Sequence, residues 1–182
     1  MAINFASEKS KLKDTLLGNA EKDDVSTSTV AKQIASWYDK AIRQSGQDAL
    51  YGNSVLQANK PALQSALQSA LQTASKNKTP SAYQQIAVAL QTGIIAYWTG
   101  ATLELTVPPP PSVQVVSNVV ANPGTFQTTI PPVSDNLDQF IQISLIVPIQ
   151  AHLLTVSGIT TSLTPQPTGP PVPVPYPFQG YI

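Results

Sequence analysis

Hydrophobic residues recur at helical spacing through the first hundred positions. In 29–43 and in 80–98 they fall every three or four residues, the interval that keeps side chains on one face of a helix. Between them, 62–74 repeats a Leu/Ala unit every four residues, which predicts a helix with a seam of small side chains. The apolar residues of an expected first helix are Phe5, Leu12, Leu16 and Leu17. The pattern predicts a small helical bundle over residues 1–100.

Beyond residue 100 the pattern changes to extended chain. Residues 102–107 alternate like a strand, and the proline run Pro108–Pro111 that follows favours a rigid polyproline spacer. Valine is frequent in 112–120, and Asn-Pro-Gly at 122–124 indicates a turn. We therefore expect a Pro/Val-rich connector over residues 101–133.

A second helical pattern occupies residues 134–160. Its apolar stripe runs from Leu137 to Val156, with Pro148 expected to kink the helix and Gly158 expected to end it. The polar positions of this stretch are mostly amides and hydroxyls, which suits packing among protein neighbours. We expect the helix to pack on the helical domain or on another subunit.

The last segment, 161–182, is rich in proline and excludes a helix or a central strand. In isolation such a segment is typical of a disordered tail, but its apolar residues favour an ordered arm that binds a neighbouring subunit. The predicted interface residues are Val172, Val174, Tyr176, Phe178, Tyr181 and Ile182, together with Pro108, Pro109, Pro110 and Pro111. The predicted fold class is mainly α, a small helical bundle with a long kinked C-terminal helix, a short extended or β segment and proline-rich extended arms.

Charge is distributed very unevenly along the 182 residues. All ten basic residues lie between Lys9 and Lys78, and the residues after Lys78 contain only the acids Glu104, Asp135 and Asp138. A surface with so few charges is poorly suited to bulk water. The charge-poor half is therefore predicted to be covered by copies of the chain or by other subunits.

Catalytic patterns are missing from the sequence. His152 is the single histidine and has no carboxylate near it in the sequence, so we expect a structural role. Asp135 and Asp138 are explained by helix capping and the helix dipole rather than by a cation site. The chain has no cysteine and no phosphate-binding, dinucleotide, nucleophile-elbow or zinc motif. We expect no enzyme activity, cofactor, metal or small-molecule substrate. Four aromatic residues are expected in the core: Trp37, Tyr38, Tyr97 and Trp98.

The same composition argues against nucleic acid and membrane partners. Clustered Lys/Arg, which either partner would favour, does not occur. The most apolar stretch, 141–156, is shorter than a membrane span and is interrupted by polar residues. The N-terminal residues do not match a secretory signal.

Four segments resemble virion structural proteins of tailed, particularly contractile-tailed, bacteriophages. They are Ala96-Tyr-Trp-Thr-Gly-Ala101, Pro108–Pro111, His152-Leu-Leu-Thr-Val-Ser-Gly158 and the proline-rich ending from Gly169. The resemblance implies a non-enzymatic subunit of the tail, baseplate, neck or capsid, located in the virion, whose partners are copies of itself and other virion proteins. Two alternatives stay open: a proline-rich protein-binding module outside a virion, and an enzyme whose active site is completed by another chain.

Overall fold

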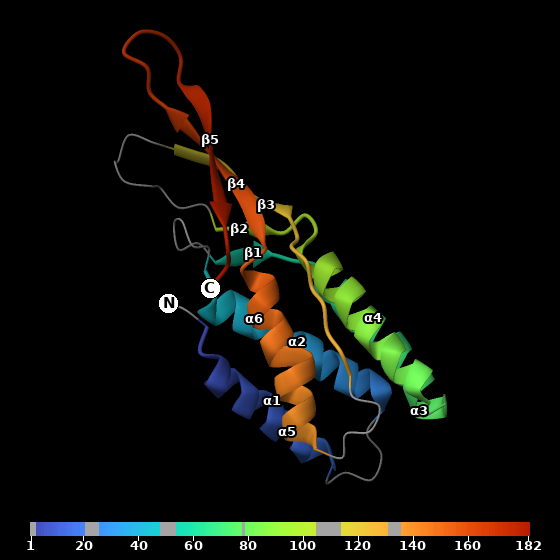
Figure 1. The fold of residues 1–182 in the computed structure, drawn as a ribbon. Coiled ribbons are helices and arrows are strands. Elements are labelled where there is room, and N and C mark those ends of the chain that lie inside the picture. Colours follow the sequence, from blue (N-terminus) through green and yellow to red (C-terminus); the bar gives the residue numbers. More distant parts are fainter. Residues whose placement is uncertain (1–2, 21–25, 48–53, 78, 105–113, 131–135) are drawn as a thin grey trace.

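The computed structural model describes residues 3–20, 26–47, 54–77, 79–104, 114–130 and 136–182. Helices form one end of the molecule, and a five-stranded antiparallel sheet forms the other (Figure 1). The predicted mainly α fold is therefore wrong. The last helix is followed by two strands rather than by an extended arm, and the sheet collects strands from Val55 to Gln179.

The four helices predicted in the first hundred residues are confirmed. Ser26 accepts a hydrogen bond from the Thr29 amide at the start of the second helix, and Thr79 accepts one from Ala82 at the start of the fourth. These contacts satisfy amides that lack a partner inside the helix. The helices are α1 (Phe5–Ala20), α2 (Thr27–Ser45), α3 (Lys60–Asn77) and α4 (Pro80–Trp98).

Helices α3 and α4 approach closely at a glycine. A Cβ atom on Gly93 would lie 2.9 Å from Cδ1 of Leu63 and 3.3 Å from Cβ of Ala66. The Leu/Ala repeat of α3 thus supplies buried leucines, including Leu67, and small residues that let the α4 backbone come near. The seam of small side chains predicted for 62–74 thus lies against Gly93 of α4.

The helical stripe expected over 134–160 is shorter than predicted and is divided into three parts. It ends at Leu153, and its middle is a π-helix in which the Val147 amide bonds to the Gln142 carbonyl, five residues back. Pro148 has no N–H for the carbonyl of Ser144, which instead accepts a 2.6 Å hydrogen bond from the Thr128 hydroxyl. The parts are α5 (Leu137–Phe140), η1 (Ile141–Ile146) and α6 (Val147–Leu153).

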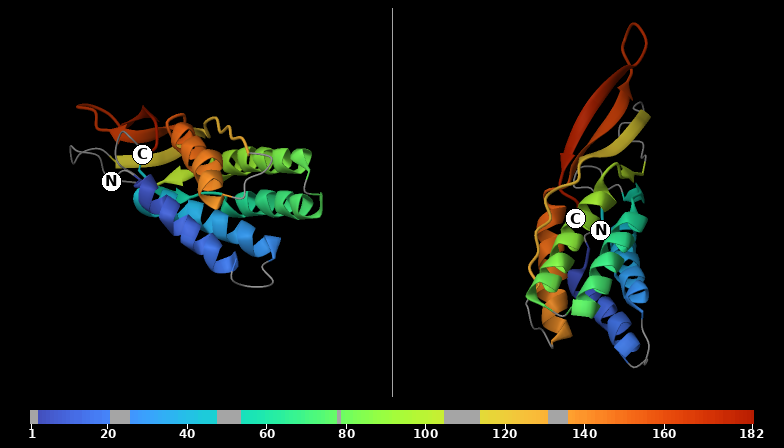
Figure 2. Two further views of the ribbon diagram at one scale, coloured as in Figure 1. Left: turned by 60° about the horizontal axis from the view of Figure 1, so that its bottom comes forward. Right: turned by 90° about the vertical axis from the view of Figure 1, so that its right-hand side faces the viewer.

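The sheet follows chain order, with every neighbouring pair antiparallel. The strands β4 and β5 form a hairpin paired continuously from Ser157 opposite Gln179 to Thr164 opposite Val172. Figure 2 shows this hairpin projecting beyond the ends of the helices. Gly158, expected to end a helix, lies inside a strand. The strands are β1 (Val55–Gln57), β2 (Thr102–Leu103), β3 (Gln114–Asn122), β4 (Ser157–Thr164) and β5 (Val172–Gln179).

An aromatic cluster joins the helices to the base of the sheet. Tyr38, Tyr97 and Trp98 are buried, as the sequence pattern predicted, whereas Trp37 is half-buried. The Trp98 indole donates a 2.8 Å hydrogen bond to the Tyr38 hydroxyl, and the Tyr38 and Tyr97 rings meet edge to face at 5.0 Å. Burial raises the pKa of both tyrosines above its usual value. The cluster is therefore neutral and well packed.

Candidate interaction surface

The projecting hairpin is fixed to the helical body by its last aromatic residues. The ring of Tyr181 packs edge-on against Trp98 at 5.0 Å. Its hydroxyl donates to the Ile42 carbonyl and accepts from the Val55 amide, both at 3.0 Å. Phe178 is also buried, against Gly158 of the facing strand. The base of the hairpin is thus held by packing and by buried hydrogen bonds.

Backbone hydrogen bonds extend this attachment to the end of the chain. The amide of Gln47 donates to the Ile182 carbonyl at 2.7 Å, and the amide of Ile182 donates to the Gln47 carbonyl at 2.8 Å. The Tyr181 amide bonds to the Leu153 carbonyl at 2.8 Å. Residues 179–182 are therefore tied to the end of α2 and to α6 of the same chain.

The predicted interface residues differ in how far they are buried in their own subunit. Phe178 and Tyr181 are buried in their own subunit, whereas Val172 and Ile182 are exposed. Val174 and Tyr176 are half-buried. That these residues bind a neighbouring subunit stays a prediction, and the exposed ones are those available for it. The residues Pro108, Pro109, Pro110 and Pro111 lie outside the described part of the chain.

The hairpin and β3 present one exposed face to the outside. Val119, Ile159 and Pro177 lie directly opposite one another on three adjacent strands. Val119 is 38% exposed, Ile159 is 39% exposed, and Pro177 is exposed. Thr161 and Pro175 form a neighbouring pair on the same face, because side chains two residues apart point the same way. We call the five residues the outward face.

The opposite face of the same strands is covered. Asn118 and Thr160 are paired across β3 and β4, are almost completely buried, and share a 2.9 Å hydrogen bond from the Thr160 hydroxyl to the Asn118 side-chain oxygen. The Asn118 side-chain amide donates to the carbonyl of Glu104 at 3.0 Å. Since this inner face is occupied by intramolecular contacts, the outward face is the one available to a partner.

Charged side chains gather on the helices and not on the hairpin. Strands β3, β4 and β5 contain no Asp, Glu, Lys or Arg. Asp138 at the start of α5 forms ion pairs with Lys9 at 3.3 Å and Lys13 at 2.8 Å of α1. Hydrogen bonds from Lys13 and Lys9 hold the pKa of the Asp138 carboxyl below its usual range. Asp138 therefore joins two helices. Asp135, the other acid considered for a cation site in the sequence analysis, lies outside the described residues.

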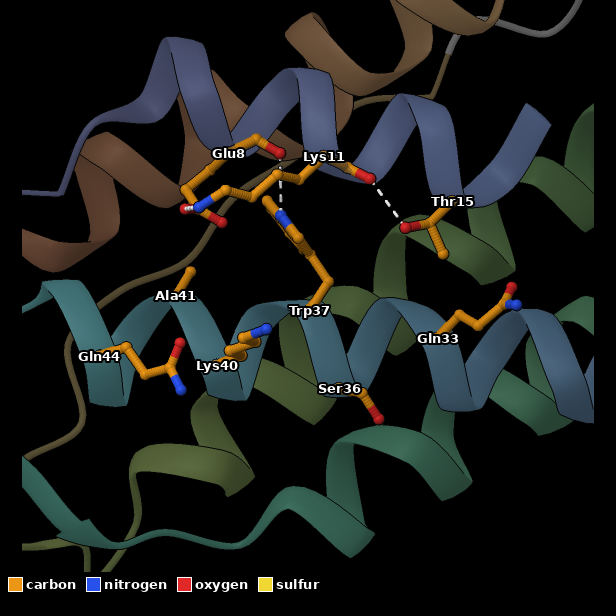
Figure 3. A pocket seen from close by; sticks show the side chains of 9 residues that line it. All are labelled: Glu8, Lys11, Thr15, Gln33, Ser36, Trp37, Lys40, Ala41 and Gln44. Atoms are coloured by element: carbon orange, nitrogen blue, oxygen red, sulfur yellow. Dashed lines mark hydrogen bonds and ion pairs between the residues drawn. The ribbon is translucent and has the colours of Figure 1, made fainter. Parts of the chain in front are cut away.

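A second candidate is the groove between α1 and α2 (Figure 3). The Trp37 indole donates to the Glu8 carbonyl at 2.9 Å, and the Glu8 carboxylate is paired with Lys11. The Thr15 hydroxyl donates to the Lys11 carbonyl at 2.8 Å. The Trp37–Glu8 bond joins the two helices, and the other two contacts lie within α1. Among the residues that line the groove, neither hydroxyl, of Thr15 or of Ser36, is hydrogen-bonded to a carboxylate or an amine.

His152 has a structural position in α6. It is fully buried, and its Nε2–H donates to the Pro123 carbonyl at 2.7 Å. Burial lowers the pKa of the imidazole to about 4. The ring also packs edge-on against Phe126 at 5.8 Å. His152 thus fastens the turn at 123–124 to the helix as a neutral group.

The outward face was not identified from the sequence. Ile159 and Thr161 were placed at the end of a helix and in an arm, and Val119 in a connector. A β-branched run does follow Gly158, and β-branched residues are typical of strands. The apolar residues of 137–156 recur at helical spacing almost up to Gly158. This pattern led us to extend the helix to residue 160 instead of predicting a strand there.

Within the described ranges, no group of three or more His, Asp or Glu side chains is placed to hold a metal ion. Among those same residues, no helix has the length and apolar character needed to cross a membrane. Comparisons of the chain with protein-family models, with curated proteins and with solved structures find no match.

Proposed function

We propose that this chain is a non-enzymatic structural subunit of a viral particle, a component of the tail, baseplate, neck or capsid of a tailed phage. It assembles with copies of itself and with other virion proteins through its charge-poor C-terminal half. The observation that carries the proposal is the outward face, an uncharged surface on a projecting and firmly anchored hairpin. No catalytic role for the chain is required.

The physical argument starts from the cost of exposing such a face. Val119 and Ile159 together leave apolar area in water, and no charged side chain in their strands offsets it. Burying apolar surface contributes about 25 cal/mol per Å² removed from water. A flat partner without charge would gain from covering this face, whereas a charged partner would lose hydration without gaining an ion pair.

Anchoring makes this face suitable for assembly. Because Phe178 and Tyr181 are buried and the last residues bond to Gln47, the hairpin base is ordered before a partner binds. A partner then does not have to supply the free energy needed to order it. A strand anchored in its own subunit thus stands where the sequence predicted an ordered, extended arm.

The test places a charge on the outward face and follows incorporation into particles. Ile159→Lys is expressed in a virus that lacks its own copy of the gene, and its amount in purified particles is measured by quantitative mass spectrometry. We expect at least a tenfold loss of incorporation relative to the wild-type chain. The matched control is Val88→Lys, since Val88 is an exposed apolar residue of α4, 59% exposed and distant in sequence from the hairpin.

Two results would contradict the proposal. One is the absence of the wild-type chain from purified particles, which would exclude a virion subunit. The other is equal incorporation of Ile159→Lys and Val88→Lys, which would leave the virion role standing but remove the outward face from it. Circular dichroism of both purified variants establishes that each one is folded.

The alternative is a binding module outside a virion. It is favoured by the exposed prolines of β5, which an aromatic groove in a partner could contact. Under this alternative the chain is missing from particles and binds a soluble partner through Pro173, Pro175 and Pro177.

A further inference from the structure

The strand β5 has a proline at every second position from 173 to 177. Pro173, Pro175 and Pro177 alternate with Val172, Val174 and Tyr176 in a strand that lies at one edge of the sheet. Proline has no backbone N–H, so each of these positions removes one donor from the strand. Which edge of β5 loses the donors depends on the register of its pairing with β4.

The register is fixed by a backbone hydrogen bond just beyond the strand. Gly180 donates its N–H to Val156 at 2.8 Å, and these residues continue the β4–β5 pairing by one step. In an antiparallel ladder, alternate residues direct both N–H and C=O to the partner, and the residues between them direct both groups away. The even-numbered residues of β5 therefore bond to β4. The prolines direct their nitrogen and carbonyl groups to the open edge.

From Pro173 to Pro177 the open edge of β5 consequently offers acceptors only, and Gln179 at the end of the strand supplies an outward N–H. Pro173, Pro175 and Pro177 present carbonyls there without a single N–H among them, and no strand pairs with this edge in the part of the chain that the structure describes. An added strand presents donors and acceptors in alternation. Its carbonyls would face proline rings in place of donors, so they would lose water without gaining a hydrogen bond.

At the opposite side of the sheet, the outermost strand β1 is protected in a different way. Strand β1 has three residues, and the carbonyl of Leu56 in it accepts a 2.7 Å hydrogen bond from Nη1 of Arg43. The guanidinium is held in place by Asp39, whose carboxylate accepts from Nε at 2.9 Å and from the Tyr97 hydroxyl at 2.9 Å. A short strand covered by a charged side chain is a poor template for strand addition.

We infer that the open edge of β5 is closed to strand addition, and that its alternating prolines keep copies of this chain from joining through this edge into a continuous sheet. The proline edge is the decisive one, because β5 is long and β1 is short. Association of copies through the β5 edge is therefore disfavoured. This inference concerns the isolated chain and does not rest on the proposed function.

The test restores the missing donors without changing the pairing with β4. In the triple variant P173V/P175V/P177V, valine suits the strand conformation and supplies three outward N–H groups. We expect the variant to self-associate at a concentration at least tenfold below that of the wild-type chain, as measured by sedimentation velocity over a concentration series. Hydrogen exchange with mass spectrometry is expected to show that amides of 173–177 become protected only in the associated form.

The matched control removes three other prolines of the same hairpin. P165V/P167V/P170V changes exposed residues between β4 and β5 and leaves the open edge as it is. We expect this variant to sediment like the wild-type chain. A further variant, P173V/P177V, keeps one proline in the middle of the edge and is expected to remain close to wild type, because the central block still interrupts the ladder.

The inference is overturned if the triple variant is folded and sediments like the wild-type chain at every concentration. It is also overturned if the triple variant associates while the amides of 173–177 exchange as fast as in the monomer, since association would then use another surface. Should the triple variant fail to fold, P175V/P177V supplies the same comparison, because it gives consecutive outward donors at positions 175, 177 and 179. A smaller shift in the same direction is then expected, and no shift overturns the inference.

Discussion

The hydroxyl of Tyr181 donates a hydrogen bond to the backbone carbonyl of Ile42, 139 residues earlier in the chain, at 3.0 Å. The same oxygen accepts from the amide of Val55, also at 3.0 Å. A single phenol thus connects the segment after β5, the last turn of the second helix and the first strand of the sheet. Both bonds are buried, so no water replaces them when the hydroxyl is removed.

Tyr181→Phe is expected to reduce the free energy of unfolding by about 1–3 kcal/mol, because it leaves a buried carbonyl and a buried amide without the phenol. Urea denaturation followed by circular dichroism measures the change. The control is Tyr83→Phe in α4, where a half-buried tyrosine loses its hydroxyl, and less than about 0.5 kcal/mol is expected. Equal effects of the two substitutions would show that the phenol of Tyr181 does not connect these elements.

Gly158→Ala tests the packing at the base of the hairpin. A Cβ atom there would collide with the carbonyl of Val119 and the ring of Phe178, and the backbone carbonyl cannot be avoided by a rotamer change. We expect a loss of about 1–3 kcal/mol in the free energy of unfolding. Gly18→Ala in α1, where a Cβ meets nothing within 4 Å, is the opposite case. Alanine there is expected to stabilise the protein by about 0.5 kcal/mol through helix propensity. Two changes of the same sign would contradict this account.

Thr128→Val tests how the π-helix tolerates Pro148. The substitution keeps the shape of the side chain but removes the hydroxyl that bonds to the Ser144 carbonyl. We expect a loss of about 1–2 kcal/mol in the free energy of unfolding, measured by thermal and urea denaturation. Thr129→Val is the adjacent control, since Ser144 bonds to the backbone carbonyl of Thr129 and not to its side chain. A neutral Thr128→Val would mean that the carbonyl finds another partner.

The stability of the protein is expected to fall in mild acid because of His152. Its pKa is lowered to about 4 in the folded protein, against about 6.5 for an ordinary histidine in the unfolded chain. The unfolded state therefore binds the proton first as the pH falls. The contribution is complete above pH 6.5, decreases between pH 6.5 and 4 by up to about 3 kcal/mol, and is constant below.

The measurement for His152 compares wild type with His152→Gln by urea denaturation from pH 7.5 to 3.5. The carboxylates titrate in both proteins, so their effect cancels in the difference between the two free energies of unfolding. The stability advantage of the wild-type protein should shrink between pH 6.5 and 4. A difference that is constant over this range would show that the imidazole is not held neutral by burial.

The protease sensitivity of the isolated chain is expected to differ between its two halves. Trypsin has no site after Lys78, so its products report only on the helical part. Chymotrypsin is expected to cleave slowly after Phe178 and Tyr181 in the isolated, folded subunit, because both side chains are buried and their backbone is paired. Gly158→Ala should accelerate this cleavage. Rapid cleavage of the wild-type chain at both sites would contradict the attachment of β5.

The helices of the first hundred residues were predictable because they are specified locally. A three-to-four spacing of apolar residues, a capping residue before the first turn and a glycine in the seam each act within one or two turns. The same rules placed Tyr38, Tyr97 and Trp98 in the core. Where the determinants lie within a few residues of one another, the sequence is sufficient.

The sheet was not predictable in the same way. Strand β2 has two residues and β1 has three, so neither leaves a periodic signal. The prolines of β5 argue against a strand until its position at the edge is known. The candidate surface depends on this sheet, because Val119, Ile159 and Pro177 come from segments that only the register brings side by side.

The sequence by itself determined the helical body, the aromatic core, the concentration of charge before residue 79 and the spacing of prolines in the last segment. Tertiary structure alone decided that the proline-rich ending is an edge strand held by its own subunit. The physical reason is that the deciding contacts join residues far apart in sequence. Strand pairing places Gly158 opposite Phe178, and a side-chain hydrogen bond joins Tyr181 to the Ile42 carbonyl. Whether an alternating proline lies on the paired side or on the open edge of a strand depends on the partner strand, and residues 172–179 considered alone carry no information about that partner.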